Sequence, residues 1–250
     1  MTKDLFSKQA SAYAKYRPSY PPALVNYILG FVGGKKHAWD CATGNGQAAV
    51  LLSPYFEKIT ATDISEKQLQ LAVKKDNIFY SVGKATPTDF PDNYFDLVTV
   101  AQAYHWLPFE PFEKEIKRVL KPGGIIAVWG YNIPVCDNPN LNILINYFYK
   151  DIIGPYWDTE RKYVDDYYKT VPFNFEELPS PTFSIDVQWN MEDLMGYFNS
   201  WSSVMNYIKK HQHNPVDDIS GKISASWQNQ GSSSIPFQFP VFMRIGRINK

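Results

Sequence analysis

The sequence predicts an α/β fold, a three-layer Rossmann-like sheet of seven mostly parallel strands with one antiparallel strand. In roughly the first 130 residues, apolar strand-like runs alternate with helical patterns, which is typical of parallel strands joined by crossover helices. Two further strand patterns come late in the chain and are separated by helices, so we expect one of them to extend the sheet in the antiparallel sense. With 250 residues, the chain is long enough to bury one sizeable core.

Five strands and four helices are expected in the first half of the chain. The strands cover residues 38–41, 59–63, 79–82, 95–100 and 125–129. The helices cover 23–32, 47–52, a segment that begins after Ser65, and 111–120. Ser65 and Gln68 have the spacing of a capping box at the start of the third helix. In the second half we expect helical structure over 138–170, helices over 192–210 and 217–228, and strands over 183–189 and 237–248.

Charge, hydropathy and cysteine content exclude several classes of protein. The 25 basic and 25 acidic side chains cancel, whereas nucleic acid and anionic membranes are bound by basic surfaces. The chain has no run of 18 apolar residues, and no apolar segment follows its first residues, so neither a membrane span nor a secretory signal is expected. The two cysteines, Cys41 and Cys136, suit a reducing compartment, and we predict a cytoplasmic protein. The 40 aromatic residues suit a surface that holds a flat or partly polar small molecule.

A turn rich in small residues follows the first predicted strand. In the segment from Asp40 to Gln47, Ala42, Gly44 and Gly46 would let a ligand approach the backbone amides closely. The turn lies at the carboxyl end of a parallel strand, where open α/β sheets bind ligands. Asp63 ends the second strand 17 residues after Gly46, and its carboxylate could accept both hydroxyls of an adenosine ribose. The segment from Gly44 to Ala49 also fits the dinucleotide fingerprint, so NAD stays an alternative.

Three other segments separate these two interpretations. More than thirty residues precede the first strand, and they include an aromatic and cationic group that could fold over a cleft, namely Tyr13, Tyr16, Arg17, Pro18 and Tyr20. The segment from Ala101 to Trp106 follows the fourth strand, at the same edge of the sheet as the turn. A helix end and a Pro-Gly-Gly turn span Arg118 to Gly124.

Together these residues resemble a class I S-adenosylmethionine-dependent methyltransferase of the small-molecule type. Within the methyltransferase type 11 group, the sequence is similar to trans-aconitate methyltransferase-like proteins. The resemblance is carried by residues 6–21, 40–46 and 102–106, and by Trp201-Ser202-Ser203 with Tyr207. It implies S-adenosyl-L-methionine as cofactor, S-adenosyl-L-homocysteine as product, and methyl transfer to a small molecule such as the carboxylate of an organic acid.

The resemblance also implies an organisation and a set of site residues. It divides a single domain into a helical lid (1–34), a cofactor-binding core (35–131), a helical insertion over the active site (132–180) and C-terminal strands and helices that complete the sheet (181–250). The expected cofactor contacts are Tyr13, Arg17, Asp40, Ala42, Gly44, Gly46, Asp63, Ile64, Ala85, Thr86, Ala101, Gln102, His105 and Trp106.

Arg17 is the candidate for binding a carboxylate of cofactor or substrate. His105 is the candidate general base for a hydroxyl or amine acceptor, and Tyr131 is expected in the wall of the pocket near the reacting atoms. No metal is expected, because His211 and His213 are two residues apart and point to different faces of a helix.

The sequence departs from the family pattern at two positions. Ala42 stands where the family commonly has glycine, and alanine is accepted there if its φ is negative. Thr86 stands where the family typically carries an acidic residue near the adenine amino group. These departures keep open a non-catalytic protein that retains the cofactor fold, beside the NAD-dependent oxidoreductase. The oligomeric state is left open by the sequence.

Overall fold

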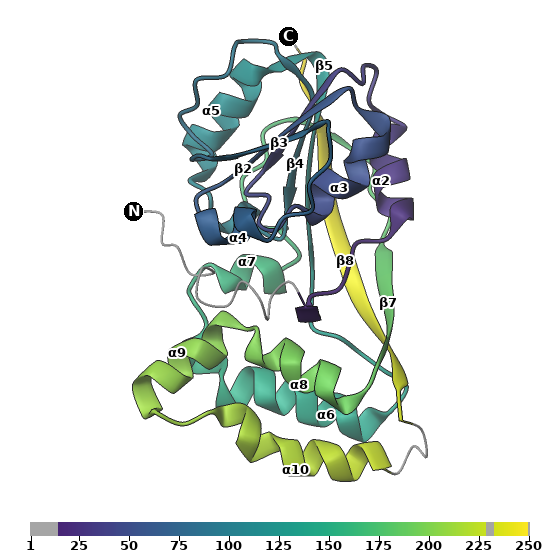
Figure 1. Ribbon diagram of the computed structural model, residues 1–250, viewed down its shortest axis with the longest axis vertical. Helices are drawn as coiled ribbons and strands as arrows, with labels where there is room; N and C mark the ends of the chain where they lie inside the picture. The colour runs from purple at the N-terminus through teal and green to yellow at the C-terminus, as the bar shows by residue number, and fades with distance from the viewer. Residues whose placement is uncertain (1–14, 229–232, 250) are drawn as a thin grey trace.

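The computed structural model describes residues 15–228 and 233–249. Tyr13 and the first part of the predicted lid, residues 1–14, lie outside the described residues. Figure 1 shows a twisted sheet with helices on both faces, and a separate group of helices below one end of the sheet. We call this lower group, α6 and α8 to α10, the cap.

The sheet is mostly parallel, with a single antiparallel strand among the described residues. Its strands run in the order β3-β2-β1-β4-β5-β8-β6, and β7 pairs with β8 as well. The bounds are β1 His37–Cys41, β2 Lys58–Asp63, β3 Ile78–Val82, β4 Phe95–Ala101, β5 Leu120–Tyr131, β6 Glu176–Leu178, β7 Phe183–Trp189 and β8 Ile235–Arg247. Strands β1 to β5 are parallel, and β8 is antiparallel to β5, β6 and β7. The predicted mostly parallel sheet with one antiparallel strand is confirmed.

The long strand β8 explains why eight strands occupy seven places in the sheet. Its second half, from Val241 to Arg247, pairs with β5. On its other edge, β6 pairs with Ile245 to Arg247 and β7 pairs with Ile235 to Val241. Two successive strands therefore fill the seventh place, and the β7–β8 ribbon runs past the end of β5 toward the cap (Figure 1).

Alternating apolar residues build one core on each face of the sheet. In β4 and β5, Leu97 and Ile125 belong to the same core as helix α2, whereas Val98 and Ile126 pack in the core of α5. This alternation follows from the two-residue period of a strand with both faces buried. The helices of this part of the chain are α2 Pro22–Leu29, α3 Gln47–Leu52, α4 Glu66–Gln70 and α5 Phe109–Val119, with short 3-10 helices at Ser53–Tyr55 and Tyr104–Trp106.

The cap is assembled from two separate parts of the chain. The first supplies α6 Pro139–Tyr147 with the following π-turn Phe148–Ile152, and the second supplies α8 Met191–Asn199, α9 Ser202–His211 and α10 Pro215–Gln228. Its apolar side chains, such as Leu141, Leu194 and Ile219, join the α2 core together with Phe237 and Phe239 of β8. A short 3-10 helix, Gly154–Tyr156, and α7, Arg161–Asp165, lead from the π-turn back toward the sheet.

Two local predictions were wrong. The single helix predicted over 192–210 is two helices, because the chain turns at Ser200 and Trp201, where the Ser200 carbonyl accepts a hydrogen bond from Arg17 Nη2 at 3.1 Å. The capping box is only half formed. The Ser65 hydroxyl accepts from the Gln68 amide at 3.4 Å, but Gln68 Oε1 makes no hydrogen bond within the described chain.

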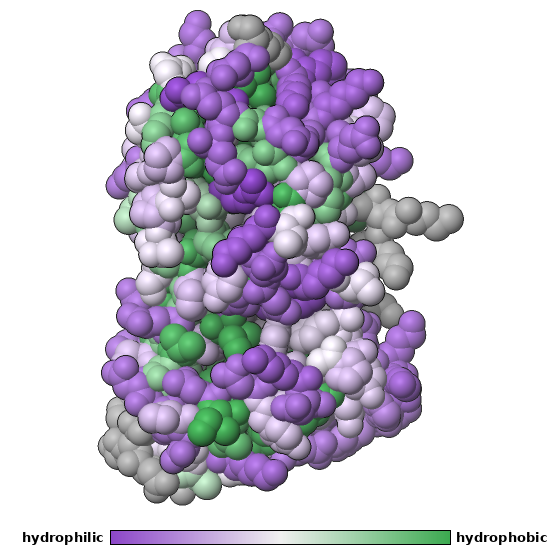
Figure 2. All heavy atoms as spheres, turned by 180° about the vertical axis from the view of Figure 1, so that it is seen from behind, coloured by the Kyte–Doolittle hydropathy of each residue, from purple (hydrophilic) through white to green (hydrophobic). Residues whose placement is uncertain are grey.

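The surface seen from behind is largely hydrophilic. Figure 2 shows hydrophobic residues reaching this face in separate patches, in both the upper and the lower half. Among the residues that the structure describes, no helix is long and apolar enough to cross a membrane.

Candidate functional site

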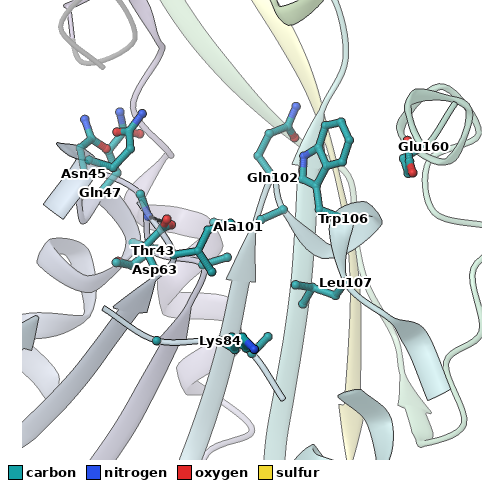
Figure 3. Close-up of a pocket in the computed structure, with 18 of the residues that line it drawn as sticks. Thr43, Asn45, Gln47, Asp63, Lys84, Ala101, Gln102, Trp106, Leu107 and Glu160 are labelled. Atoms are coloured by element: carbon teal, nitrogen blue, oxygen red, sulfur yellow. Dashed lines mark hydrogen bonds between the residues drawn. The ribbon is translucent and has the colours of Figure 1, made fainter. Parts of the chain in front are cut away.

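A pocket opens at the carboxyl ends of β1, β2 and β4, between the sheet and the segment that precedes α7. Its volume is about 260 Å³, just below the range for small-molecule sites, ~300–1,000 Å³. It is lined by Tyr20, Ala42, Thr43, Gly44, Asn45, Gln47, Ala48, Asp63, Ile64, Gln68, Gly83, Lys84, Ala85, Thr86, Ala101, Gln102, Ala103, Trp106, Leu107, Pro108, Asp158 and Glu160. Figure 3 shows Asn45, Gln47 and Asp63 on one side, Trp106 and Glu160 on the other, and Ala101 between them.

The turn after β1 takes left-handed backbone conformations at three positions. The φ angles are +54° at Ala42, +57° at Gly44 and +84° at Gly46. The condition under which alanine would be accepted at position 42, a negative φ, is therefore not met, and an alanine is held where glycine is favoured. Ala42 and Gly44 line the pocket, whereas Gly46 does not: a Cβ at Gly46 would collide with the ring of Tyr80.

Asp40 lies beneath this turn and holds it in place. Its side chain is fully buried and accepts hydrogen bonds from the Thr43 hydroxyl, from the Thr99 hydroxyl at 2.8 Å and from the Ala49 amide at 3.1 Å. Burial raises the pKa of Asp40 to about 6, although these hydrogen bonds oppose the shift. Asp40 was predicted to contact the cofactor, but it does not line the pocket and acts on the turn from behind.

Asp63 ends β2 and does line the pocket. Its Oδ2 accepts from the Gly44 amide at 2.8 Å, and its Oδ1 accepts from the Ser65 amide at 2.8 Å. Each carboxylate oxygen has further lone pairs, so hydroxyl groups of a ligand could bind at the same oxygens. The same carboxylate thus links the turn after β1 to the start of α4.

Gln68 is a pocket residue that the sequence placed only in a helix cap. Its side chain is 2% exposed, and Oε1 has no hydrogen-bond partner among the described residues. A Cβ built at Gly44 would lie 4.0 Å from this oxygen. A buried acceptor without a donor is costly, and a donor group of a ligand in the pocket would satisfy it.

The segment after β3 forms the next part of the wall. Lys84, Ala85 and Thr86 line the pocket, as does Ile64 after β2. The Thr86 hydroxyl donates to the Pro111 carbonyl at 3.4 Å, so its oxygen can still accept a hydrogen bond.

The segment after β4 contributes Ala101, Gln102 and Trp106. The Gln102 side chain is fixed by the backbone of Tyr131, which receives a bond from Nε2 at 3.1 Å and gives one to Oε1 at 2.8 Å. Gln102 therefore joins the ends of β4 and β5, and presents its remaining surface to the pocket beside Ala101 and Trp106 (Figure 3).

Besides Asp40 and Gly46, three predicted residues lie outside the pocket wall. His105 is buried, with Nδ1 2.8 Å from the Tyr168 hydroxyl, and burial together with the charge of Arg161 lowers its pKa to about 3. The Tyr131 side chain is buried too, and its hydroxyl accepts from Arg17 Nη1 at 3.2 Å. Arg17 also lies over the ring of Tyr197, 5.2 Å from its centroid. Each of the three side chains is thus held by contacts within the protein, and its role in binding or catalysis stays a prediction.

Asp158 and Glu160 complete the wall opposite the turn, and sequence reasoning missed both. They come from the segment between the 3-10 helix Gly154–Tyr156 and α7, in a part of the chain where no motif was recognised. Their spacing alone carries no signal, since acidic residues are ordinary in surface loops.

Comparison with known proteins identifies the family. A profile described as a methyltransferase domain matches residues 39–128, the stretch from β1 to β5 that forms most of the pocket. A Dictyostelium discoideum protein named as a methyltransferase is 32% identical over 249 residues, which are 98% of this chain and 95% of that protein. The chain belongs to the methyltransferase family.

Other methyltransferases are similar to part or to most of this chain. A Saccharomyces cerevisiae protein, named as an S-adenosylmethionine-dependent methyltransferase, is 31% identical over 173 residues, covering 64% of this chain and 59% of that protein. A solved structure from Anaeromyxobacter dehalogenans, described as a type II methyltransferase, has a TM-score of 0.84 and 30% identity, covering 94% of this chain and all of the other. This methyltransferase therefore has the class I fold, whose members use S-adenosylmethionine.

The pocket of this methyltransferase fits that cofactor on three observations. Ala42 and Gly44 leave the turn after β1 without bulky side chains in the pocket wall, Asp63 offers a carboxylate at the end of β2, and the buried oxygen of Gln68 lacks a donor within the described residues. When bound, S-adenosylmethionine supplies an activated methyl group on a sulfonium.

Proposed function

We propose that this chain binds S-adenosyl-L-methionine in the pocket and transfers its methyl group to a small molecule. The observation that carries the proposal is the pocket wall formed by Gly44, Asp63 and Gln68 at the carboxyl ends of β1 and β2. The chain's residues act by alignment and by excluding water, which is what an in-line methyl transfer mainly requires.

Each part of the wall has its own role in this proposal. Asp63 accepts hydrogen bonds from the ribose hydroxyls, the segment from Lys84 to Thr86 faces the adenine, and Ala42 and Gly44 leave the turn open to the amino-acid end. Trp106 and Leu107 cover the reacting end, and residues 132–180 close the pocket from the cap side.

The acceptor is a small molecule in this proposal, because the pocket volume is about 260 Å³ and the net charge of the chain is zero. The sequence resemblance suggested a carboxylate, with Arg17 to bind it. Arg17 is instead engaged by Tyr131, Ser200 and the ring of Tyr197. A carboxylate acceptor would therefore need another cation.

Calorimetric titration with S-adenosylmethionine, S-adenosylhomocysteine and NAD tests the cofactor directly. We expect micromolar binding of the first two and no binding of NAD. Binding of NAD alone would overturn the proposal in favour of an oxidoreductase. Binding of neither nucleotide class would favour a non-catalytic protein that retains the fold.

A further inference from the structure

We propose that the acceptor presents a basic nitrogen, which Asp158 and Glu160 bind in the pocket wall opposite the glycine turn. This inference rests on the proposed function and names the substrate class of the same pocket. It replaces the carboxylate suggested by the sequence resemblance with a group of opposite charge.

The first argument is that the carboxylates of Asp158 and Glu160 have no cation of their own. Within residues 15–228 and 233–249, neither side chain forms an ion pair within 4.0 Å. Asp158 Oδ2 is buried and has no hydrogen-bond partner there, and Glu160 Oε2 accepts only from the hydroxyl of Thr159, at 3.1 Å. An unpaired buried carboxylate oxygen is unfavourable, and a cationic ligand would remove that cost.

The second argument is that the adjacent cation is used elsewhere. Arg161 Nε donates to the Tyr149 hydroxyl at 2.7 Å and to Asp165 at 3.2 Å, and its guanidinium lies 4.7 Å from the ring centroid of Trp157. Although Arg161 follows Glu160 directly in the sequence, its side chain is held away from the pocket wall. The fold thus separates the two acidic groups from their nearest neighbour in the chain that could neutralise them.

The third argument concerns position. In Figure 3, Glu160 lies beyond Trp106, on the side of the pocket away from Asp63 and the turn. Lys84 is the only cationic side chain in the wall as the structure describes it, and it follows β3. The half of the pocket beside Trp106 is therefore acidic and aromatic, and these are the two features that bind ammonium groups.

Methyl transfer to such an acceptor needs no protein groups beyond these two carboxylates. The ammonium form of the acceptor binds to the carboxylates, and the nitrogen must lose one proton before it can react. Glu160 takes that proton and passes it to solvent. The nitrogen lone pair then forms the bond to the methyl carbon, while the carbon–sulfur bond breaks and its electron pair stays on sulfur, which becomes a neutral thioether.

Two acceptor panels, each with matched carbon skeletons, test the preference for a cationic acceptor. The probes are 2-phenylethylamine, 2-phenylethanol and phenylacetate, with butylamine, butanol and butyrate as an aliphatic set, and formation of S-adenosylhomocysteine is measured. We expect kcat/KM for the amines to exceed that for the matched carboxylates at least tenfold. Methylation of the carboxylates in preference, or of neither amine by protein that binds S-adenosylmethionine, would overturn the inference. A failure to bind S-adenosylmethionine would instead overturn the proposed function.

Charge-neutralising variants assign the preference to these two residues. Asp158→Asn and Glu160→Gln are each expected to raise KM for the amine about tenfold and to leave the Kd of S-adenosylhomocysteine within twofold of the parent value. Asp151→Asn, an exposed position in the same segment and outside the pocket, is the matched control and should leave KM unchanged. A loss of S-adenosylhomocysteine affinity as large as the rise in KM would mean that the carboxylates serve the cofactor, and would overturn the inference.

Discussion

The two walls of the pocket treat their polar groups in different ways. On the sheet side, both carboxylate oxygens of Asp63 accept hydrogen bonds from backbone amides, in the turn and at the start of α4. Behind this wall, Asp40 accepts from the hydroxyls of Thr43 and Thr99 and from an amide of α3. On the opposite side, within the part of the chain described by the structure, the carboxylates of Asp158 and Glu160 accept a single hydrogen bond in total, from the Thr159 hydroxyl to Glu160. The first wall, which we call the cradle, is held in place by hydrogen bonds within the protein. The second wall presents carboxylates to a ligand in the pocket.

Because of this difference, we expect the two walls to determine different properties of the protein. Bonds that fix the backbone set the shape of the cradle, so changes there should affect cofactor affinity and protein stability together. A buried carboxylate oxygen without a partner does not stabilise the fold, so neutralising changes in the opposite wall should affect acceptor selectivity and leave the free energy of unfolding equal or higher. The following predictions compare the two walls, beginning with the largest effect.

Gly44→Val should abolish cofactor binding, with at least a hundredfold loss of affinity for S-adenosylhomocysteine. Gly44 has φ +57° and lines the pocket, so a β-branched side chain both strains the backbone and fills the space of the ligand. The strain should also lower the free energy of unfolding by about 1–2 kcal/mol. Calorimetry and chemical denaturation measure the two effects.

Ala42→Gly is the matched control for that substitution. It relieves an alanine at φ +54° two residues away, so it should preserve binding and raise the free energy of unfolding by about 0.5–1 kcal/mol. If Gly44→Val were to bind normally, the turn would have no part in the cradle.

Asp63→Ala should weaken cofactor binding by about 1–3 kcal/mol, because it removes a charged acceptor from the pocket wall. It also leaves the Gly44 and Ser65 amides without their acceptor, so the melting temperature should fall as well. Asp63→Asn keeps one oxygen and should lie between the variant and the parent protein in both measurements. Unchanged affinity in Asp63→Ala would remove this residue from the binding site.

Gln68→Leu should separate stability from affinity within the sheet wall. The change removes a buried oxygen that has no donor in the described protein, so the free energy of unfolding should stay equal or rise by up to about 1 kcal/mol. If that oxygen accepts a bond from the cofactor, affinity for S-adenosylhomocysteine should fall by about 0.5–1.5 kcal/mol. A loss of stability with no loss of affinity contradicts the assignment of Gln68 to the ligand.

The last prediction concerns the pH dependence of stability and the buried carboxylate of Asp40. Because burial raises the pKa of Asp40 from 3.8 to about 6, the folded protein binds a proton more tightly than the unfolded chain between these values. The contribution of Asp40 to the free energy of unfolding should therefore decrease as pH rises from about 4 to 6. The difference in unfolding free energy between the parent protein and Asp40→Asn, measured by denaturation across this range, isolates that contribution. If the parent protein instead became more stable relative to Asp40→Asn as pH rises, the ionised carboxylate would be stabilised by its hydrogen bonds and the prediction would be wrong.

The sequence predicted the fold well because its signals were local. Alternating apolar runs and glycine turns located β1 to β5, and the late strand patterns located β7 and β8. It predicted the sheet wall of the pocket for the same reason, since Ala42, Gly44 and Asp63 follow directly from strand ends.

Other features of the site are set by long-range contacts. His105 follows β4 as a catalytic residue would, yet Tyr168, 63 residues away, takes its Nδ1 in the core. Ala42 has a left-handed φ in a turn that is held by another strand. The Thr62 carbonyl and the Asp63 carboxylate of β2 accept hydrogen bonds from the two amides that follow Ala42. Asp158 and Glu160 reach the pocket only because the chain returns from the cap to the sheet, which no local pattern reveals.

Strand β8 pairs with the sheet along one part of its length and with β7 along the other, and the two pairings meet at Val241. This residue is paired with Tyr131 of β5 on one side and with Phe183 of β7 on the other. A single inserted residue at this point would shift one half of the strand against the other and turn Phe237 and Phe239 out of the core. Among homologous chains, length variation should therefore accumulate in the loop between β6 and β7 and be absent from the middle of β8, which makes this strand the reference for aligning distant relatives.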